Sequence, residues 1–122
     1  MNVSRGEVHW VKLPTREEAD NKTTGSEYGK RRPAVVLQSD SEPDSIDTKL
    51  VVPTTSGESG DARYLTWVFI SSGQECVPED SIAMCTQLRV ADDNRFDGKI
   101  GELSHPKLRE IEKATQVALD LL

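Results

Sequence analysis

Short apolar runs that alternate with polar turn segments are the feature of this chain that most constrains its fold. Runs of β-branched and aromatic residues are typical of strands, and clusters of Gly, Pro, Asp and Ser between them are typical of turns. The runs predict strands at residues 7–13, 33–38, 49–55, 64–71, 81–87 and 99–103. The long helical crossovers that parallel strands need are missing from the sequence. We therefore expect a small, barrel-like antiparallel sheet in a mainly-β protein.

The C-terminal segment is the one place where apolar residues recur at helical spacing. Ser104 or His105 can cap a helix there, and Pro106 fits its first turn. The apolar stripe comprises Leu108, Ile111, Thr115, Ala118 and Leu122, widened by Val117 and Leu121. Such a stripe predicts one amphipathic helix that packs on the sheet. A length of 122 residues fits a single domain over residues 1–122.

Charge is unevenly distributed along the chain. The formal net charge is −6, which by itself argues against nucleic acid as a partner. Acidic residues gather between positions 38 and 61, whereas Lys30, Arg31 and Arg32 stand consecutively. Screening limits the reach of each charge to about 8–10 Å, so a local basic patch can bind phosphate on an acidic protein. Residues 15–30, which lead into this patch, are polar and are expected to form a mobile loop.

Membrane, export and metal-binding patterns are missing from the sequence. No apolar run reaches the roughly 18 residues of a transmembrane helix, and the first residues lack the pattern of a signal peptide. We expect a cytoplasmic protein without membrane association, in which Cys76 and Cys85 are reduced thiols. Neither His9 nor His105 has metal-ligand spacing to these cysteines, so we expect no metal and no cofactor. His9 is either packed or at the rim of a site.

Several segments read together resemble a known family. RGEVHWV at residues 5–11, GSEYGKRRPAVVL at 25–37 and VVPTTS at 51–56 occur in that order. SIAMCTQLRV at 81–90 and IGELSHPKLREIEKATQVALDL at 100–121 follow them. Each motif alone is weak, but five in order with compatible spacing make a specific match. The chain resembles the MazF/PemK toxins over nearly its whole length.

The resemblance implies a fold, an activity and partners. The fold would be a small SH3-like or CcdB-like antiparallel β-barrel with a C-terminal helix, working as a homodimer. The activity would be metal-independent, sequence-selective cleavage of single-stranded mRNA by an endoribonuclease toxin. In that chemistry the ribose 2′-OH attacks the adjacent phosphorus and leaves 2′,3′-cyclic phosphate and 5′-OH ends. A cognate antitoxin protein would neutralise the toxin.

The resemblance also assigns roles to particular residues. Arg32, kept extended by the proline that follows it, corresponds to the family's catalytic arginine. Thr55 corresponds to the active-site threonine, and Glu27 corresponds to an acidic loop residue that could assist proton transfer. The residues expected to contact RNA are Lys30, Arg31, Ser56, Gln87 and Arg89.

The chain departs from the family pattern at one place, and two other functions compete with the nuclease hypothesis. Some members carry an arginine and an aspartate as acid and base where this chain has Met84 and Thr86. The chain therefore resembles the branch that relies on Arg32 and Thr55. A CcdB-like toxin of the same fold would instead bind a protein target such as gyrase, and an SH3-like module would only bind. The Arg-Pro entry to the second strand, together with Thr55, favours the nuclease.

Overall fold

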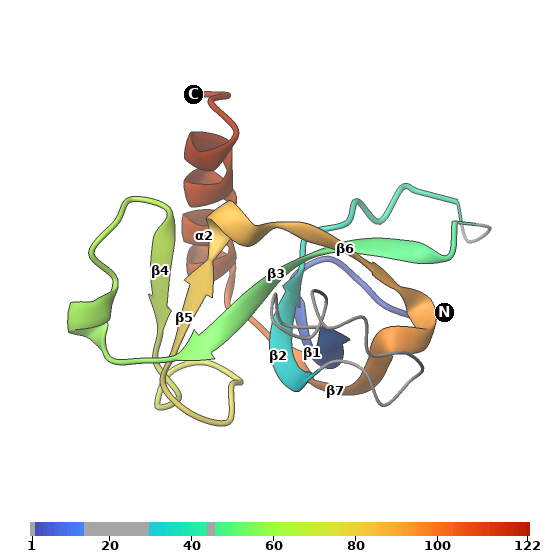
Figure 1. Ribbon diagram of the computed structural model, residues 1–122, viewed down its shortest axis with the longest axis horizontal. Helices are drawn as coiled ribbons and strands as arrows, with labels where there is room; N and C mark the ends of the chain where they lie inside the picture. The colour runs from blue at the N-terminus through green and yellow to red at the C-terminus, as the bar shows by residue number, and fades with distance from the viewer. Residues whose placement is uncertain (1, 14–29, 44–45) are drawn as a thin grey trace, which may run out of the picture.

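The computed structural model describes residues 2–13, 30–43 and 46–122 of the chain. This part is a mostly antiparallel β-sheet with one C-terminal helix, as the sequence predicts (Figure 1). The loop predicted at residues 15–30 lies outside the described residues except for Lys30, which begins a strand. No helix within the described ranges is long and apolar enough to cross a membrane.

Seven strands and one α-helix make up the described part. The strands are β1 (Glu7–Leu13), β2 (Lys30–Val36), β3 (Thr48–Ser56), β4 (Trp67–Ile70), β5 (Ser81–Met84), β6 (Arg89–Asp92) and β7 (Phe96–Glu102). Short 3-10 turns lie between them: η1 (Ser59–Asp61), η2 (Cys85–Gln87) and η3 (Asp93–Arg95). The helix is α2 (His105–Ala118).

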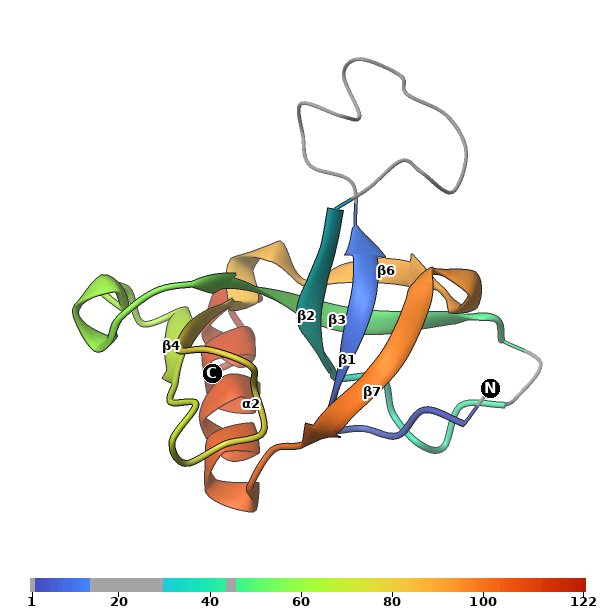
Figure 2. The same ribbon diagram turned by 90° about the horizontal axis from the view of Figure 1, so that it is seen from below.

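The sheet does not close into the barrel that the sequence predicts. Its order is β4-β5-β3-β2-β1-β7, and β6 pairs with the first half of β3. Among the described residues, β7 pairs only with β1, and β6 pairs only with β3. The sheet is therefore open between β6 and β7. Figure 2 shows β3 and β6 running across the direction of β2, β1 and β7. The turn η3 lies between β6 and β7, and after it the chain pairs with β1 as strand β7.

Two hydrophobic cores lie on the two faces of the central strands. Alternate residues of β2 enter different cores: Val35 packs in the first, and Ala34 and Val36 pack in the second. The first core also takes Ile70 from β4 and Ile111 from α2. This two-sided burial explains why the β2 segment reads as a continuous apolar run rather than an alternating one. In the edge strand β4, only alternate residues are buried.

The helix α2 begins where the sequence predicts, and Ser104 is its cap. The Ser104 side chain accepts a hydrogen bond from the backbone N–H of Lys107. Ile111, Ala114 and Thr115 are buried against the sheet. The end of the predicted stripe behaves differently, because Val117 and Leu121 are exposed. The C-terminal end of the helix therefore presents apolar surface that the described part of the chain does not cover.

Candidate active site

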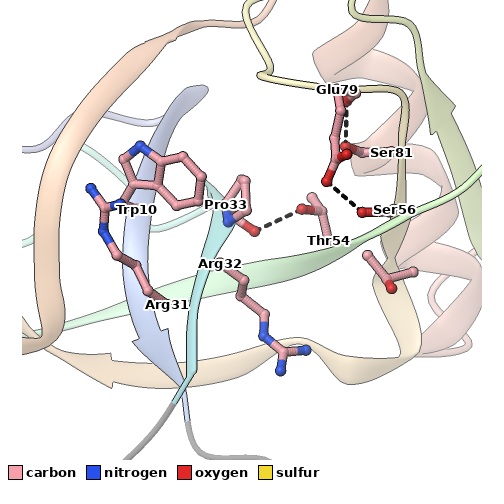
Figure 3. Close-up of a pocket in the computed structure, with 9 residues that line it drawn as sticks. Trp10, Arg31, Arg32, Pro33, Thr54, Ser56, Glu79 and Ser81 are labelled. Carbon is pink, nitrogen blue, oxygen red and sulfur yellow. Dashed lines mark hydrogen bonds between the residues drawn. The ribbon is translucent and has the colours of Figure 1, made fainter. Parts of the chain in front are cut away.

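A cavity of about 320 Å³ opens where β2, β3 and β5 come together beside β1. Figure 3 shows its walls, with Trp10 and Arg31 at one end and Ser56, Glu79 and Ser81 at the other. The complete lining is Trp10, Arg31, Arg32, Pro33, Thr54, Thr55, Ser56, Glu79 and Ser81. Two of the three residues predicted to be catalytic, Arg32 and Thr55, are among them. Polar and charged side chains dominate this lining, as expected of a site for a polar ligand.

The antiparallel pairing of β2 with β3 brings Arg32 and Thr55 together. Ala34 lies opposite Pro53, so the residues that precede Ala34 run alongside those that follow Pro53. The Thr54 hydroxyl donates a hydrogen bond to the Pro33 carbonyl oxygen over 2.8 Å. This bond fixes the entry of β2 against β3 directly beside the two predicted residues.

Arg32 is a half-buried cation with unused hydrogen-bonding capacity. Its Nε is buried and has no hydrogen-bond partner within the part of the chain that the structure describes. A buried donor without a partner costs about 1–3 kcal/mol, so natural proteins rarely leave one without a reason. At the wall of a polar cavity, an arginine of this kind is well placed to bind an anion.

Arg31, predicted to contact RNA, is held by two other groups. Its Nε lies 2.8 Å from Asp97 Oδ2, and its guanidinium carbon lies 4.3 Å from the centre of the Trp10 ring. Asp97 therefore offsets the charge of Arg31, while the guanidinium stacks on Trp10. Lys30 begins β2, and its side chain is outside the described residues. The free cation of this basic run, within the described part, is Arg32.

The hydroxyl groups of the cavity differ in what they already bind. Thr54 donates to Pro33, and Ser81 donates to the backbone oxygen of Glu79 over 2.7 Å. Ser56 donates to the carboxylate of Glu79. Thr55 is exposed, and its hydroxyl has no such bond among the described residues. Thr55 is therefore the hydroxyl of the lining that is ready to meet a ligand.

Glu79 is a residue that sequence reasoning missed. It follows a Val-Pro pair in a polar turn, where an acidic residue attracts no notice. The pairing of Ser56 with Ser81 places the residues before β5 beside the end of β3, and so brings Glu79 to the cavity. The predicted strand ends at 55 and 81 could have shown this, had the pairing of those strands been considered. Trp10 likewise reads in the sequence as a strand residue rather than a site residue.

Gln87 and Arg89, also predicted to contact RNA, do not line the cavity. Gln87 ends the turn η2, and Arg89 opens β6 opposite Val51. Our strand at residues 81–87 is therefore too long, because the chain turns after Met84. Met84 is buried and Thr86 is exposed on that turn. Glu27 lies outside the described residues.

His9 is a packed residue and does not lie at the rim of the cavity. Its Nε2 lies 2.9 Å from Glu7 Oε1, and its ring meets Phe96 edge-on at 5.5 Å. Lys99 Nζ lies 3.0 Å from the other oxygen of Glu7. Burial raises the pKa of Glu7, but hydrogen bonds from His9, the backbone of Ser4 and Lys99 outweigh it, so this pKa lies below its usual range. Glu7, His9 and Lys99 thus form an ionic network around a buried carboxylate, on the face of β1 opposite to Trp10.

Clusters of three or more His, Cys, Asp or Glu side chains that could hold a metal ion are missing from the described residues. Cys76 is exposed and Cys85 is buried, and both are free thiols.

Comparisons with known proteins agree on the fold and the family. One relative, named endoribonuclease MazF, from Staphylococcus saprophyticus, is 29% identical over 119 residues, which cover 98% of this chain and 92% of that protein. The toxin MazF-mt6 of Mycobacterium tuberculosis has a similar structure, with a TM-score of 0.71 at 19% identity, covering 95% of this chain and 98% of that one. A MazE–MazF structure from Deinococcus radiodurans gives a TM-score of 0.72 at 18% identity and covers 100% of both chains.

The family match extends over almost the same length. The family described as PemK-like, MazF-like toxin of type II toxin–antitoxin system matches residues 4–119. The match takes in every strand and the helix, and with them all the walls of the cavity. The chain therefore belongs to the PemK-like, MazF-like toxins of type II toxin–antitoxin systems.

Proposed function

We propose that this toxin is an endoribonuclease that cuts single-stranded RNA in the cavity between β2, β3 and β5. The carrying observation is that Arg32, with its unpartnered buried Nε, and Thr55, with its free hydroxyl, share one cavity in the described part of a member of this toxin family. The relative named endoribonuclease MazF supports the same reaction class.

The proposed reaction is attack of a ribose 2′-OH on the adjacent phosphorus. It gives a 2′,3′-cyclic phosphate and a 5′-OH end, and it takes no metal. Negative charge builds on the phosphorane oxygens, and a fixed cation such as Arg32 stabilises that charge more than it stabilises the ground state. Thr55 donates a hydrogen bond to a phosphate oxygen or orients the 2′-OH.

The residues around this centre would bind the RNA on either side of the cut. Trp10, kept in place by Arg31, offers a ring face on which a base can stack. Ser56 lies within the cavity, whereas Gln87 and Arg89 would meet the RNA only beyond it. Lys30 adds positive charge at the start of β2. The proposed role of Glu27 in proton transfer rests on the family resemblance alone, because this residue lies outside the described part of the chain.

Partners and location complete the proposal. A cognate antitoxin would cover the cavity with an acidic segment, and a mycobacterial endoribonuclease of similar fold, with a TM-score of 0.74, was solved with its cognate antitoxin. Two copies of this chain would form a homodimer through exposed apolar side chains near the helix end, namely Leu50, Val90, Val117, Leu119, Leu121 and Leu122. Such a toxin acts on mRNA in the cytoplasm.

The deciding experiment is cleavage of a long mixed-sequence RNA by the purified protein in EDTA. We expect discrete cuts, a 2′,3′-cyclic phosphate at the 3′ end of each upstream fragment, and much slower formation of these products with Arg32→Ala. Substitution of 2′-deoxyribose at a mapped site should abolish that cut. Intact RNA under all conditions, with binding to gyrase instead, would contradict the nuclease and favour the CcdB-like alternative.

A further inference from the structure

We propose that Glu79 is the general base of this site, the group that takes the proton from the attacking 2′-OH. The inference rests on the proposed ribonuclease function and adds a catalytic residue to it. Glu79 is the only carboxylate in the lining of the cavity, as far as the described residues show. It lines the same cavity as the two residues that carry the proposed reaction.

The carboxylate of Glu79 is oriented by a hydrogen bond to one of its two oxygens. Ser56 donates its hydroxyl hydrogen to Oε1, and Ser81 fixes the Glu79 backbone oxygen from the same side. Within the described ranges no donor is bonded to Oε2. Figure 3 shows the side chain reaching toward Ser56 at the β3 end of the cavity. One oxygen thus positions the carboxylate, and the other remains available to accept a proton.

The position of Glu79 in the sheet suits a base rather than a phosphate contact. A carboxylate repels phosphate, so in a site for RNA it must face another part of the nucleotide. In-line attack needs the proton acceptor and the group that meets the leaving oxygen on opposite sides of the phosphorus. Glu79 precedes β5 and Arg32 lies on β2, with β3 between them. The two side chains therefore reach the cavity from opposite sides of β3, which suits groups that act on opposite sides of one phosphorus.

The step balances without a further reactant. Glu79 Oε2 takes the proton of the 2′-OH, and the 2′ oxygen forms a bond to phosphorus. The bond between phosphorus and the 5′ oxygen then breaks, and the leaving oxygen takes a proton from the Arg32 guanidinium. Arg32 regains its proton from water, and Glu79 releases its proton to water. The products are the cyclic phosphate and the 5′-OH end.

The test is the pH dependence of single-turnover cleavage for the wild type and Glu79→Gln, which keeps the size and removes the charge. We expect the wild-type rate to rise with pH and then level off, because the base must be deprotonated to accept a proton. Glu79→Gln should lose this rise and react roughly 10²–10⁴-fold more slowly, the usual contribution of a positioned base. Binding of a 2′-deoxy RNA that cannot be cut should be unchanged or tighter, because a negative charge is gone.

Two further variants make the outcome decisive. Glu42→Gln removes the same charge from an exposed position outside the cavity and should cleave at the wild-type rate. Glu27→Gln tests the acid suggested by the family resemblance. If the wild type cuts RNA in EDTA but Glu79→Gln keeps its rate and pH profile, Glu79 is not the base although the nuclease stands. Loss of the pH dependence in Glu27→Gln alone leads to the same conclusion. A wild type that does not cut RNA removes the proposed function itself.

Discussion

Arg32 is a half-buried cation at the wall of the candidate cavity. Its Nε is buried without a partner in the described part, and the neighbouring Arg31 is already paired with Asp97. We predict that Arg32→Ala lowers the single-turnover cleavage rate by roughly 10²–10³-fold, the effect of removing one preorganised donor. Thr55→Val should lose less, because a hydroxyl carries no net charge. Arg109→Ala, on the exposed face of α2, is the matched control and should cleave normally. An Arg32→Ala protein with the wild-type rate would remove this mechanism.

Glu7 shows at the same scale how a buried charge can be structural. Burial raises its pKa, but hydrogen bonds from His9, Ser4 and Lys99 lower it by more, so the net shift is downward. The ionised carboxylate therefore stabilises the fold above its unfolded pKa, and this contribution is lost as the pH falls through the lower folded pKa. We predict that Glu7→Gln reduces the free energy of unfolding by about 1–3 kcal/mol at neutral pH. In urea titrations the difference from wild type should shrink as the pH falls through the folded pKa of Glu7.

The control for Glu7→Gln is Glu102→Gln, which removes the exposed carboxylate bound to the same lysine. An exposed ion pair contributes little, so Glu102→Gln should stay within about 0.5 kcal/mol of wild type. A Glu7→Gln protein that is as stable as wild type at neutral pH would show that the buried network adds nothing to the fold.

At the scale of the element, the start of α2 depends on one serine with two tasks. The Ser104 hydroxyl accepts from the backbone of Lys107 and donates to Glu75 Oε2 over 2.7 Å. Ser104→Ala should cost about 1 kcal/mol of unfolding free energy, as lost caps do. Aspartate is ordinarily as good a cap as serine, but here it would face the Glu75 carboxylate. We predict that Ser104→Asp is no more stable than Ser104→Ala in urea unfolding, and that Glu75→Gln restores the aspartate variant.

Elements with a strong local pattern could be predicted from the sequence, and elements set by pairing could not. The strand β1 has the ends that the sequence predicts, because Glu7–Leu13 combines β-branched and aromatic residues and stops before a proline. The strand β6 was missed, since Arg89–Asp92 has one apolar pair and owes its extended form to pairing with β3. The open sheet has the same cause, because no local signal says whether β6 and β7 meet.

The candidate site divides in the same way. Arg32 and Thr55 stand in motifs that adjoin the strand ends, and the β2–β3 pairing brings them into one cavity. Glu79 reaches that cavity through the pairing of β3 with β5, which no single segment reveals. Gln87 and Arg89 belong to a motif of the same strength, yet the turn η2 carries them away from the cavity. Sequence motifs thus predict candidate site residues, whereas the pairing of strands decides which of those residues meet.

At the scale of the whole molecule, the end of α2 is a region where apolar side chains are exposed to solvent. Leu119 is 52% exposed and Leu121 is 67% exposed, and both follow directly on the end of α2 at Ala118. Leu119 also borders a surface hollow with Leu50 and Leu88, whose other walls are Arg5, Leu37, Glu112, Thr115 and Gln116. A second copy that covers this region would bury the same patch on both chains, as a two-fold interface requires. We therefore propose the helix end and this hollow as the contact of the homodimer.

The corresponding prediction concerns Leu119→Asp, which sets a charge in the middle of the proposed interface. Light scattering at micromolar concentration should give the mass of a dimer for the wild type and of a monomer for Leu119→Asp, because an unpaired charge buried between two chains is strongly unfavourable. Leu65→Asp is the matched control: this leucine is 84% exposed, lies before β4 and should tolerate the charge without a change of mass. A wild type that is monomeric would remove the homodimer. If Leu119→Asp is still dimeric, the dimer contact lies elsewhere on the molecule. If Leu119→Asp is monomeric, its cleavage activity shows whether a single subunit can cut RNA.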